Sequence, residues 1–146
     1  DPKLSHINLH FLGDLAENDI NQLSHDLDSF RGNFGPISLV LTGTGAFPSL
    51  DNPRILFLGV KDSIDNQLIN LYQQTAQIIN KQNIKTEDRP FIAHITLGRI
   101  KEENTQLDFT GEEMRDVEFK ISSFELMSSE LSVQGPEYSV IKSYQL

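Results

Sequence analysis

Two different spacings of apolar residues run along the chain, and each is typical of one kind of secondary structure. Apolar residues recur three or four positions apart from Ile20 to Phe30, as on the buried face of a helix, and Gly32 marks the end of this stretch. Residues 65–83 carry a second stripe with the same period. We therefore expect two amphipathic helices.

Other segments alternate between apolar and polar residues or are continuously apolar, which favours strands. Residues 4–12 alternate, so that Ile7 and Leu9 point one way while His6 and Asn8 point the other. The predicted strands are residues 4–12, 37–47, 54–60, 91–100, 117–131 and 138–146. We expect a glycine bulge or bend in the second strand, antiparallel pairing of the second with the third, a polar loop at 101–116 and a final hairpin around Gly135-Pro136.

The order of these elements divides the chain into two similar halves. Each half combines one helix with three strands, and each contains one strand with the pattern His-x-polar-Leu. The two patterns start 88 positions apart (94 − 6 = 88), which is too far for a solenoid repeat and too close for independent domains. We predict one α+β domain over residues 1–146, with two lobes that share a core and helices packed outside antiparallel sheets.

The charge of the chain limits the size of its ligands. The 12 basic and 21 acidic side chains give a net charge of −9, which opposes the electrostatic binding of long nucleic acids. We expect no long double-stranded nucleic acid partner. A single nucleotide or a chain end remains open as a ligand, because a local cluster of donors can bind it.

The composition also narrows the setting. No stretch approaches the roughly 20 consecutive apolar residues that cross a bilayer, and no apolar secretory region begins the chain. With no cysteine, the chain has neither disulfides nor thiolate metal sites. We expect a soluble, cytoplasmic protein that binds no membrane and acts as a monomer.

The main candidates for chemistry are two matching tetrapeptides. In a strand, alternate residues share a face, so His6 lies beside Asn8. The same spacing sets His94 beside Thr96. If a pseudo-twofold axis brings these faces together, two imidazoles flank a pocket with two polar side chains for an anion. One such motif alone indicates only a surface histidine, and the second copy is what favours a site.

Two histidines near neutral pH suit the opening of a cyclic phosphodiester. This reaction needs a base that deprotonates water and an acid that protonates the leaving ribose oxygen. The amide of Asn8 and the hydroxyl of Thr96 can donate to the non-bridging oxygens. Two histidines without a partnered carboxylate or cysteine cluster are a poor metal site, so we expect no metal and no cofactor. His10 and His25 lack matching copies and are interpreted as structural, although His10 shares the predicted face of His6.

These motifs carry a resemblance to a known family. The matching stretches are residues 6–14 (HINLHFLGD), 45–48 (GAFP), 53–60 (PRILFLGV), 89–99 (RPFIAHITLGR) and 124–138 (FELMSSELSVQGPEY). In this order they resemble the two-histidine phosphoesterases, specifically the bacterial and archaeal RNA 2',3'-cyclic phosphodiesterases, also called 2'-5' RNA ligases. The resemblance implies a bilobal fold in which two antiparallel sheets line a central cleft. It also implies metal-free hydrolysis of 2',3'-cyclic phosphate ends of RNA or nucleotides to 2'-phosphates, with a reversible ligase activity.

The resemblance assigns roles to individual residues. His6 and His94 would be the catalytic pair, with His94 as base and His6 as acid, although pseudo-symmetry makes these roles interchangeable. Asn8 and Thr96 would bind the phosphate. Arg99 would bind the phosphate or the base, which requires the strand to end or bulge at Gly98, since strict alternation would turn Arg99 to the other face.

The chain departs from the family pattern at three places. Asn8 stands where the family has threonine or serine, and Ala93 replaces a usual proline. The family opens with a strand and a helix before the first motif, and we expect this chain to lack them. A base-stacking aromatic often comes from that region. Phe47 and Phe91 could replace it, but aromatic residues in apolar strands are more often core, so neither is assigned to the site.

Two other functions fit the same residues. The chain could be a module that binds nucleotides or RNA ends and has lost efficient chemistry through Asn8. It could also hydrolyse 2'-5' oligonucleotides or another cyclic nucleotide phosphate. The sequence does not choose among these.

Overall fold

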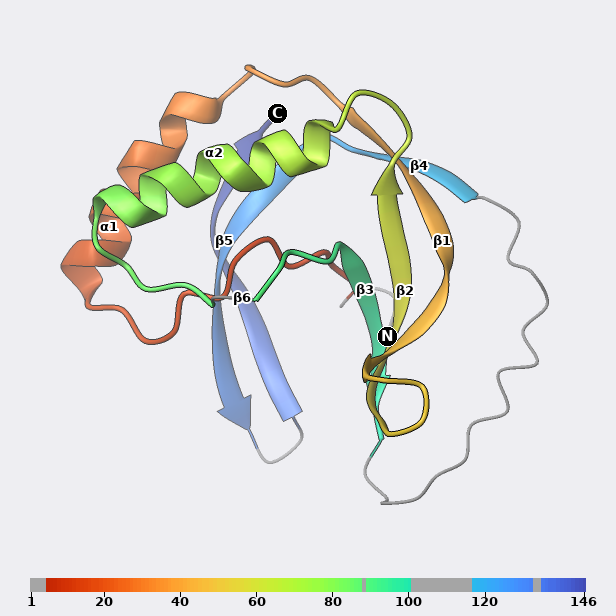
Figure 1. Cartoon of the computed structure of the whole chain (residues 1–146). Helices are drawn as coiled ribbons and strands as arrows, with labels where there is room; N and C mark the ends of the chain where they lie inside the picture. The colour runs from red at the N-terminus through yellow and green to blue at the C-terminus, as the bar shows by residue number, and fades with distance from the viewer. Residues whose placement is uncertain (1–4, 88, 101–116, 133–134) are drawn as a thin grey trace.

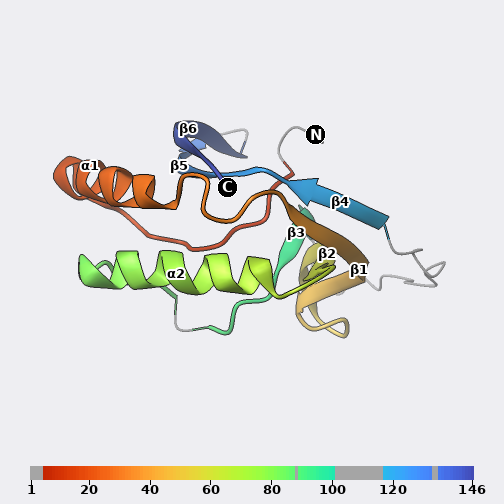
Figure 2. The same cartoon turned by 90° about the horizontal axis from the view of Figure 1, so that it is seen from above.

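The computed structural model describes residues 5–87, 89–100, 117–132 and 135–146. In chain order the elements are α1 (Glu17–Asp26), the 3-10 helix η2 (Leu27–Phe30), β1 (Ile37–Pro48), β2 (Pro53–Asp62), α2 (Gln67–Lys81), β3 (His94–Arg99), β4 (Val117–Ile121), β5 (Ser123–Ser132) and β6 (Gly135–Gln145). The two α-helices lie side by side (Figures 1 and 2).

The strands form two antiparallel sheets. One has four strands in the order β3-β2-β1-β4, and the other is the hairpin β5-β6. Only Ser122 separates β4 from β5, so the chain passes directly from one sheet to the other. The architecture is α+β, as the sequence predicts.

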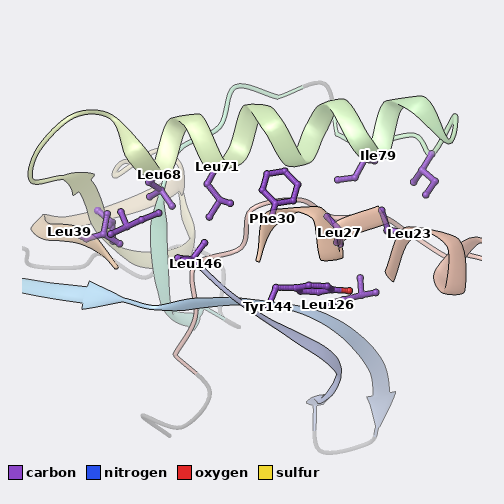
Figure 3. Close-up of a cluster of buried hydrophobic side chains, with 13 residues drawn as sticks. Leu23, Leu27, Phe30, Leu39, Leu68, Leu71, Ile79, Leu126, Tyr144 and Leu146 are labelled. Carbon is purple, nitrogen blue, oxygen red and sulfur yellow. The ribbon is translucent and has the colours of Figure 1, made fainter. Parts of the chain in front are cut away.

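A single hydrophobic core joins both sheets to both helices. It contains the helical stripes of α1, η2 and α2, and side chains from the inner faces of β1, β2, β5 and β6 (Figure 3). Tyr144 of β6 is fully buried, and its hydroxyl donates to the carbonyl of Ser24 at 3.0 Å, so its polar atom is satisfied inside the core. Truncation of a fully buried leucine here, such as Leu71, costs about 2–5 kcal/mol by the usual scale for core cavities.

The predicted glycine bulge lies between β1 and β2. Leu41 pairs with Val60 and Gly43 pairs with Gly59, which leaves Thr42 as the extra residue. Gly43 has φ +115°, a region that side chains rarely adopt. A Cβ atom at Gly59 would collide with the Thr42 hydroxyl, so position 59 beside the bulge requires glycine.

Most of the predicted elements are confirmed. Both amphipathic helices are present, the strands at 37–47, 54–60 and 91–100 correspond to β1, β2 and β3, and β1 pairs antiparallel with β2. The predicted loop at 101–116 lies outside the described residues.

Two strand predictions are wrong, and a third is wrong in one detail. Residues 5–12 form no strand; the segment makes one isolated bridge, Ile7 to Ile95, and then turns toward α2, where His10 bonds. Residues 117–131 are two strands, because the chain changes sheets at Ser122. The predicted final hairpin is confirmed as β5-β6, but its turn is misplaced, because Gly135 already pairs with Ser132 and Gly135-Pro136 is the start of β6.

Among the described residues, no helix has the length and apolar character needed to cross a membrane.

Candidate active site

The second motif lies on β3, and pairing with β2 defines the direction of its side chains. His94 pairs with Gly59 and Thr96 pairs with Phe57, and opposed residues in an antiparallel ladder point to the same side of the sheet. His94 and Thr96 therefore share the face opposite Ile95, which packs against the core. The predicted sharing of one face by His94 and Thr96 is confirmed.

A bulge in β3 brings Arg99 to this face. The register shifts between Thr96 and Gly98, so Leu97 is the extra residue and is 56% exposed. Arg99 pairs with Ile55, which lies two positions from Phe57 on β2 and so on the same face. The bulge that the assignment of Arg99 requires is present, one residue earlier than expected.

Contacts on two sides hold the His94 ring. Its Nδ1 lies 2.6 Å from the carbonyl oxygen of Ile92, and because a carbonyl only accepts, Nδ1 carries the proton. In the neutral imidazole this leaves Nε2 with the lone pair. Phe47 and Phe57 contact the ring at centroid distances of 5.1 and 5.3 Å. The tautomer of the neutral His94 ring and its orientation are therefore defined by these contacts.

The first motif reaches the second through one antiparallel bridge. Ile7 pairs with Ile95, and an antiparallel pair has a local twofold axis between its opposed residues. One step from the bridge, this axis relates His6 to His94. This local twofold belongs to the bridge, and a pseudo-twofold between the two halves of the chain stays a prediction.

The bridge also brings the polar side chains of the two motifs near each other. The pairing described for the first motif is at Ile7 alone, with His6 on the Thr96 side of the bridge and Asn8 on the His94 side. Three of these residues are exposed and His94 is half-buried, so the face is open to a ligand.

His6 connects this site to the second sheet. Its ring meets the ring of Tyr138 on β6 edge-on, with centroids 5.2 Å apart. Figure 1 shows the segment before α1, in red, running between β3 and the β5-β6 hairpin. The candidate active site therefore lies where the two sheets approach each other.

His10 does not belong to this face. Its Nε2 lies 2.9 Å from the Thr75 hydroxyl and 3.1 Å from the Tyr72 carbonyl, and its ring stacks on Tyr72. Burial lowers the pKa of His10 below 6.5. The structural interpretation of His10 holds, and the idea that it lines the pocket is wrong, because the segment is not a strand beyond the bridge.

Three aromatic residues of the site were not assigned from the sequence. Phe47 and Phe57 lie beside His94, and Tyr138 lies beside His6. For Phe47 the sequence did offer a signal. Gly43 and Gly45 precede it at alternate positions, and glycine leaves room for a neighbouring ring: a Cβ atom at Gly45 would collide with the ring of Phe57. Phe91, by contrast, stacks on Tyr72 and contacts the core.

In the described part of the chain, no three histidine, aspartate or glutamate side chains gather closely enough to hold a metal ion.

Comparison with known proteins connects this geometry to a family. A family model for LigT-like phosphoesterases matches residues 58–138, which include the second motif and Tyr138. The RNA 2',3'-cyclic phosphodiesterase of Aquifex aeolicus is 30% identical over 100% of this chain and 80% of its own length. The enzyme of the same name from Aeropyrum pernix is 33% identical over 93% of this chain and 78% of its own length.

Solved structures share the fold. TT0787 of Thermus thermophilus superposes with a TM-score of 0.77 at 28% identity and covers 100% of this chain and 80% of that one. E. coli LigT complexed with 3'-AMP superposes with a TM-score of 0.78 at 23% identity, over 100% of this chain and 79% of that one. The second likeness concerns the fold alone.

Proposed function

This chain belongs to the LigT-like phosphoesterase family, and from that premise we propose that it is an RNA 2',3'-cyclic phosphodiesterase that forms 2'-phosphates. The observation that carries the proposal is the Ile7–Ile95 bridge. It pairs two His-x-polar motifs about a local twofold on an open face, which is the arrangement that acid–base attack on a cyclic phosphate needs.

The two histidines have different roles in the proposed reaction. His94 is the base: its Nδ1 proton is held by the Ile92 carbonyl, and Nε2 takes a proton from the attacking water. The oxygen of that water bonds to phosphorus, and the bond from phosphorus to the 3'-oxygen breaks. His6, on the other side of the phosphoryl group, gives its proton to the leaving oxygen. The product carries a 2'-phosphate and a 3'-hydroxyl.

Donors on the same face stabilise the charge that develops. Asn8 and Thr96 each stand two positions from a histidine and one from the bridge, and their amide and hydroxyl are proposed to donate to the non-bridging oxygens. Arg99 extends this face along β3 and is proposed to bind the phosphate or the base of the substrate. These local donors act in a chain whose net charge is −9, which favours a short RNA end over a long duplex.

The proposal extends to the domain organisation, the reverse reaction, the oligomeric state and the location of the protein. The shared core of both sheets and both helices supports one bilobal domain over residues 1–146. We also propose that it catalyses the reverse, 2'-5' ligating reaction and that it acts as a monomer in the cytoplasm.

Turnover of the protein with EDTA present tests the proposal. We expect hydrolysis of 2',3'-cyclic AMP and of an oligoribonucleotide with a 2',3'-cyclic end, with unchanged rate in EDTA and with 2'-phosphate as the product seen by ³¹P NMR. Absence of turnover on both substrates would contradict the proposal. Cleavage of 2'-5' linked oligonucleotides in preference to cyclic ends would favour the alternative diesterase.

A further inference from the structure

Three aromatic rings form a continuous stack beside the candidate active site but outside its open face. His10 lies on Tyr72 with centroids 4.5 Å apart and planes 15° from parallel, and Phe91 lies on Tyr72 at 4.3 Å and 9°. Two rings that both lie flat on a third at these distances must occupy its opposite faces, because on one face they would overlap. Tyr72 of α2 is therefore the central ring of the stack.

Hydrogen bonds fix the His10 end of the stack. Thr75 is 2% exposed, and its hydroxyl donates to the Leu71 carbonyl at 2.8 Å. That hydroxyl has a single proton, so His10 Nε2 is the donor in its contacts with Thr75 Oγ1 and the Tyr72 carbonyl. Tyr72 is thus bonded to His10 through its backbone and stacked on it through its ring.

The two ends of the stack lead directly into the two histidine motifs. His10 follows His6 by four residues, and Phe91 precedes His94 by three. Ile92, next to Phe91, supplies the carbonyl that binds His94 Nδ1. The segment from Phe91 to His94 is further tied to β2, because the Val60 amide donates to the Ala93 carbonyl at 3.0 Å.

In the described part of the chain, the first motif is joined to the sheet by its backbone at one place. Its described pairing is the one bridge at Ile7, and a single backbone hydrogen-bond pair contributes little to net stability. Packing of Ile7 and Leu9 against the core fixes the depth of the segment. The stack adds a second attachment for this segment, at His10. His10 and Phe91 both stack on Tyr72, so both are held by α2.

We propose that the His10–Tyr72–Phe91 stack is a positioning device that holds both catalytic segments on α2. His10 is a positioning residue in it: its ring supports Tyr72, Tyr72 supports Phe91, and the position of Phe91 sets the Ile92 carbonyl that orients His94. The catalytic part of this inference rests on the proposed phosphodiesterase function. The geometric part does not depend on turnover.

Three variants separate positioning from general stability. His10→Ala removes the ring and both hydrogen bonds, whereas His10→Phe keeps a ring and removes only the hydrogen bonds. Phe34→Ala is the matched control, since Phe34 also stacks on a neighbour, Phe30, at 6.1 Å and borders the core but lies in neither motif. Chemical unfolding of all three measures the loss of stability, and steady-state kinetics on 2',3'-cyclic AMP separate kcat from KM.

We expect His10→Ala to lower kcat about 10- to 100-fold, as a small misplacement of reacting groups does, and to change KM much less. His10→Phe should recover part of this loss in kcat, since it keeps a ring on Tyr72 but lacks the hydrogen bonds to Thr75 and the Tyr72 carbonyl. Phe34→Ala should lose stability but keep its kcat. Wild-type kcat in folded His10→Ala, or an equal fall of kcat in Phe34→Ala, would overturn the proposal.

A second measurement needs no catalysis. In ¹⁵N-labelled protein, the Nδ1 proton of His94 should exchange slowly with water because it is bonded to Ile92. His10→Ala should speed this exchange more than His10→Phe does. If the unmodified protein shows no turnover but this pattern holds, the function fails and the positioning role stands. If His10→Ala does not fold, Phe91→Leu removes the other outer ring and is expected to speed the same exchange. Unchanged exchange in a folded variant would refute the role.

Discussion

The two histidine motifs are nearly identical in sequence, but the protein holds them in different ways. The second lies in β3, paired with β2 over five positions, and its histidine is half-buried against Phe47 and Phe57. The first makes one bridge, and its histidine is exposed beside Tyr138. A sheet thus supports one half of the site, and side-chain packing supports the other.

This difference has a consequence for chemistry. A base must have a defined tautomer and a defined direction, and His94 receives both from the Ile92 carbonyl and its aromatic neighbours. His6 is exposed and meets Tyr138 edge-on, so the two histidines differ in how firmly the described contacts orient them. The asymmetry between the two segments therefore favours His94 as base, where the sequence motifs alone left the two roles interchangeable.

The largest expected effect comes from removal of either histidine. His94→Ala and His6→Ala should each lower kcat/KM for 2',3'-cyclic AMP by about 10²- to 10⁴-fold, the usual contribution of a general acid or base. Because His94 also packs against two aromatic rings, its loss should lower the unfolding free energy more than the loss of His6. His25→Ala, on the surface of α1, is the control. Retained activity in His94→Ala would exclude the proposed mechanism.

Replacement of Asn8 by the family's residue tests the weaker half of the site. Asn8→Thr should raise kcat by roughly 10-fold, because the hydroxyl of a β-branched residue donates from a more restricted position. Kinetics and calorimetric binding of 2'-AMP measure the two quantities separately. A rise of several orders of magnitude with unchanged affinity would mean that the native protein is better described as a binding module.

Truncations at the bridge compare the two supports directly. Ile95→Ala should cost about 2 kcal/mol of unfolding free energy, the lower end for large apolar residues, since Ile95 is half-buried in a paired strand. Ile7→Ala should lower the unfolding free energy less than Ile95→Ala. The ratio of the loss in kcat to the loss in unfolding free energy should nevertheless be larger for Ile7→Ala, because Ile7 anchors a segment with one described bridge. Urea unfolding and kinetics of both variants provide the comparison. Equal ratios would show that the two segments are held alike.

The smallest expected effect is on the pH dependence of the unfolding free energy, through His10 in the His10–Tyr72–Phe91 stack. Because the folded-state pKa of His10 is lowered by burial, the unfolded chain binds more protons as the pH falls below 6.5. The stability that neutral His10 contributes is therefore complete above that pH and is lost as the pH falls toward the lowered pKa. Unfolding free energies at several pH values should show a shallower fall in His10→Phe than in the original protein. Parallel curves would mean that His10 does not titrate in the folded state in this way.

Much of the scaffold follows from local patterns. The helical stripes predicted α1 with η2 and α2, and the apolar run before Gly59 predicted β2, because these segments bury one face or both wherever they lie. The segment at residues 5–12 alternates just as clearly but is not a strand. Alternation shows which side chains share a side, whereas a strand needs a paired edge, and that depends on the rest of the fold.

The sequence by itself determined which residues offer chemistry: two histidines, each two positions from a polar companion, with Arg99 beyond the second. Only the tertiary structure decided how they meet. The Ile7–Ile95 bridge creates the local twofold, and the bulge at Leu97 turns Arg99 to the same face. The packing of α2 takes His10 away from it. Backbone pairing and ring stacking join residues more than 60 positions apart, and no periodicity within one segment contains that information.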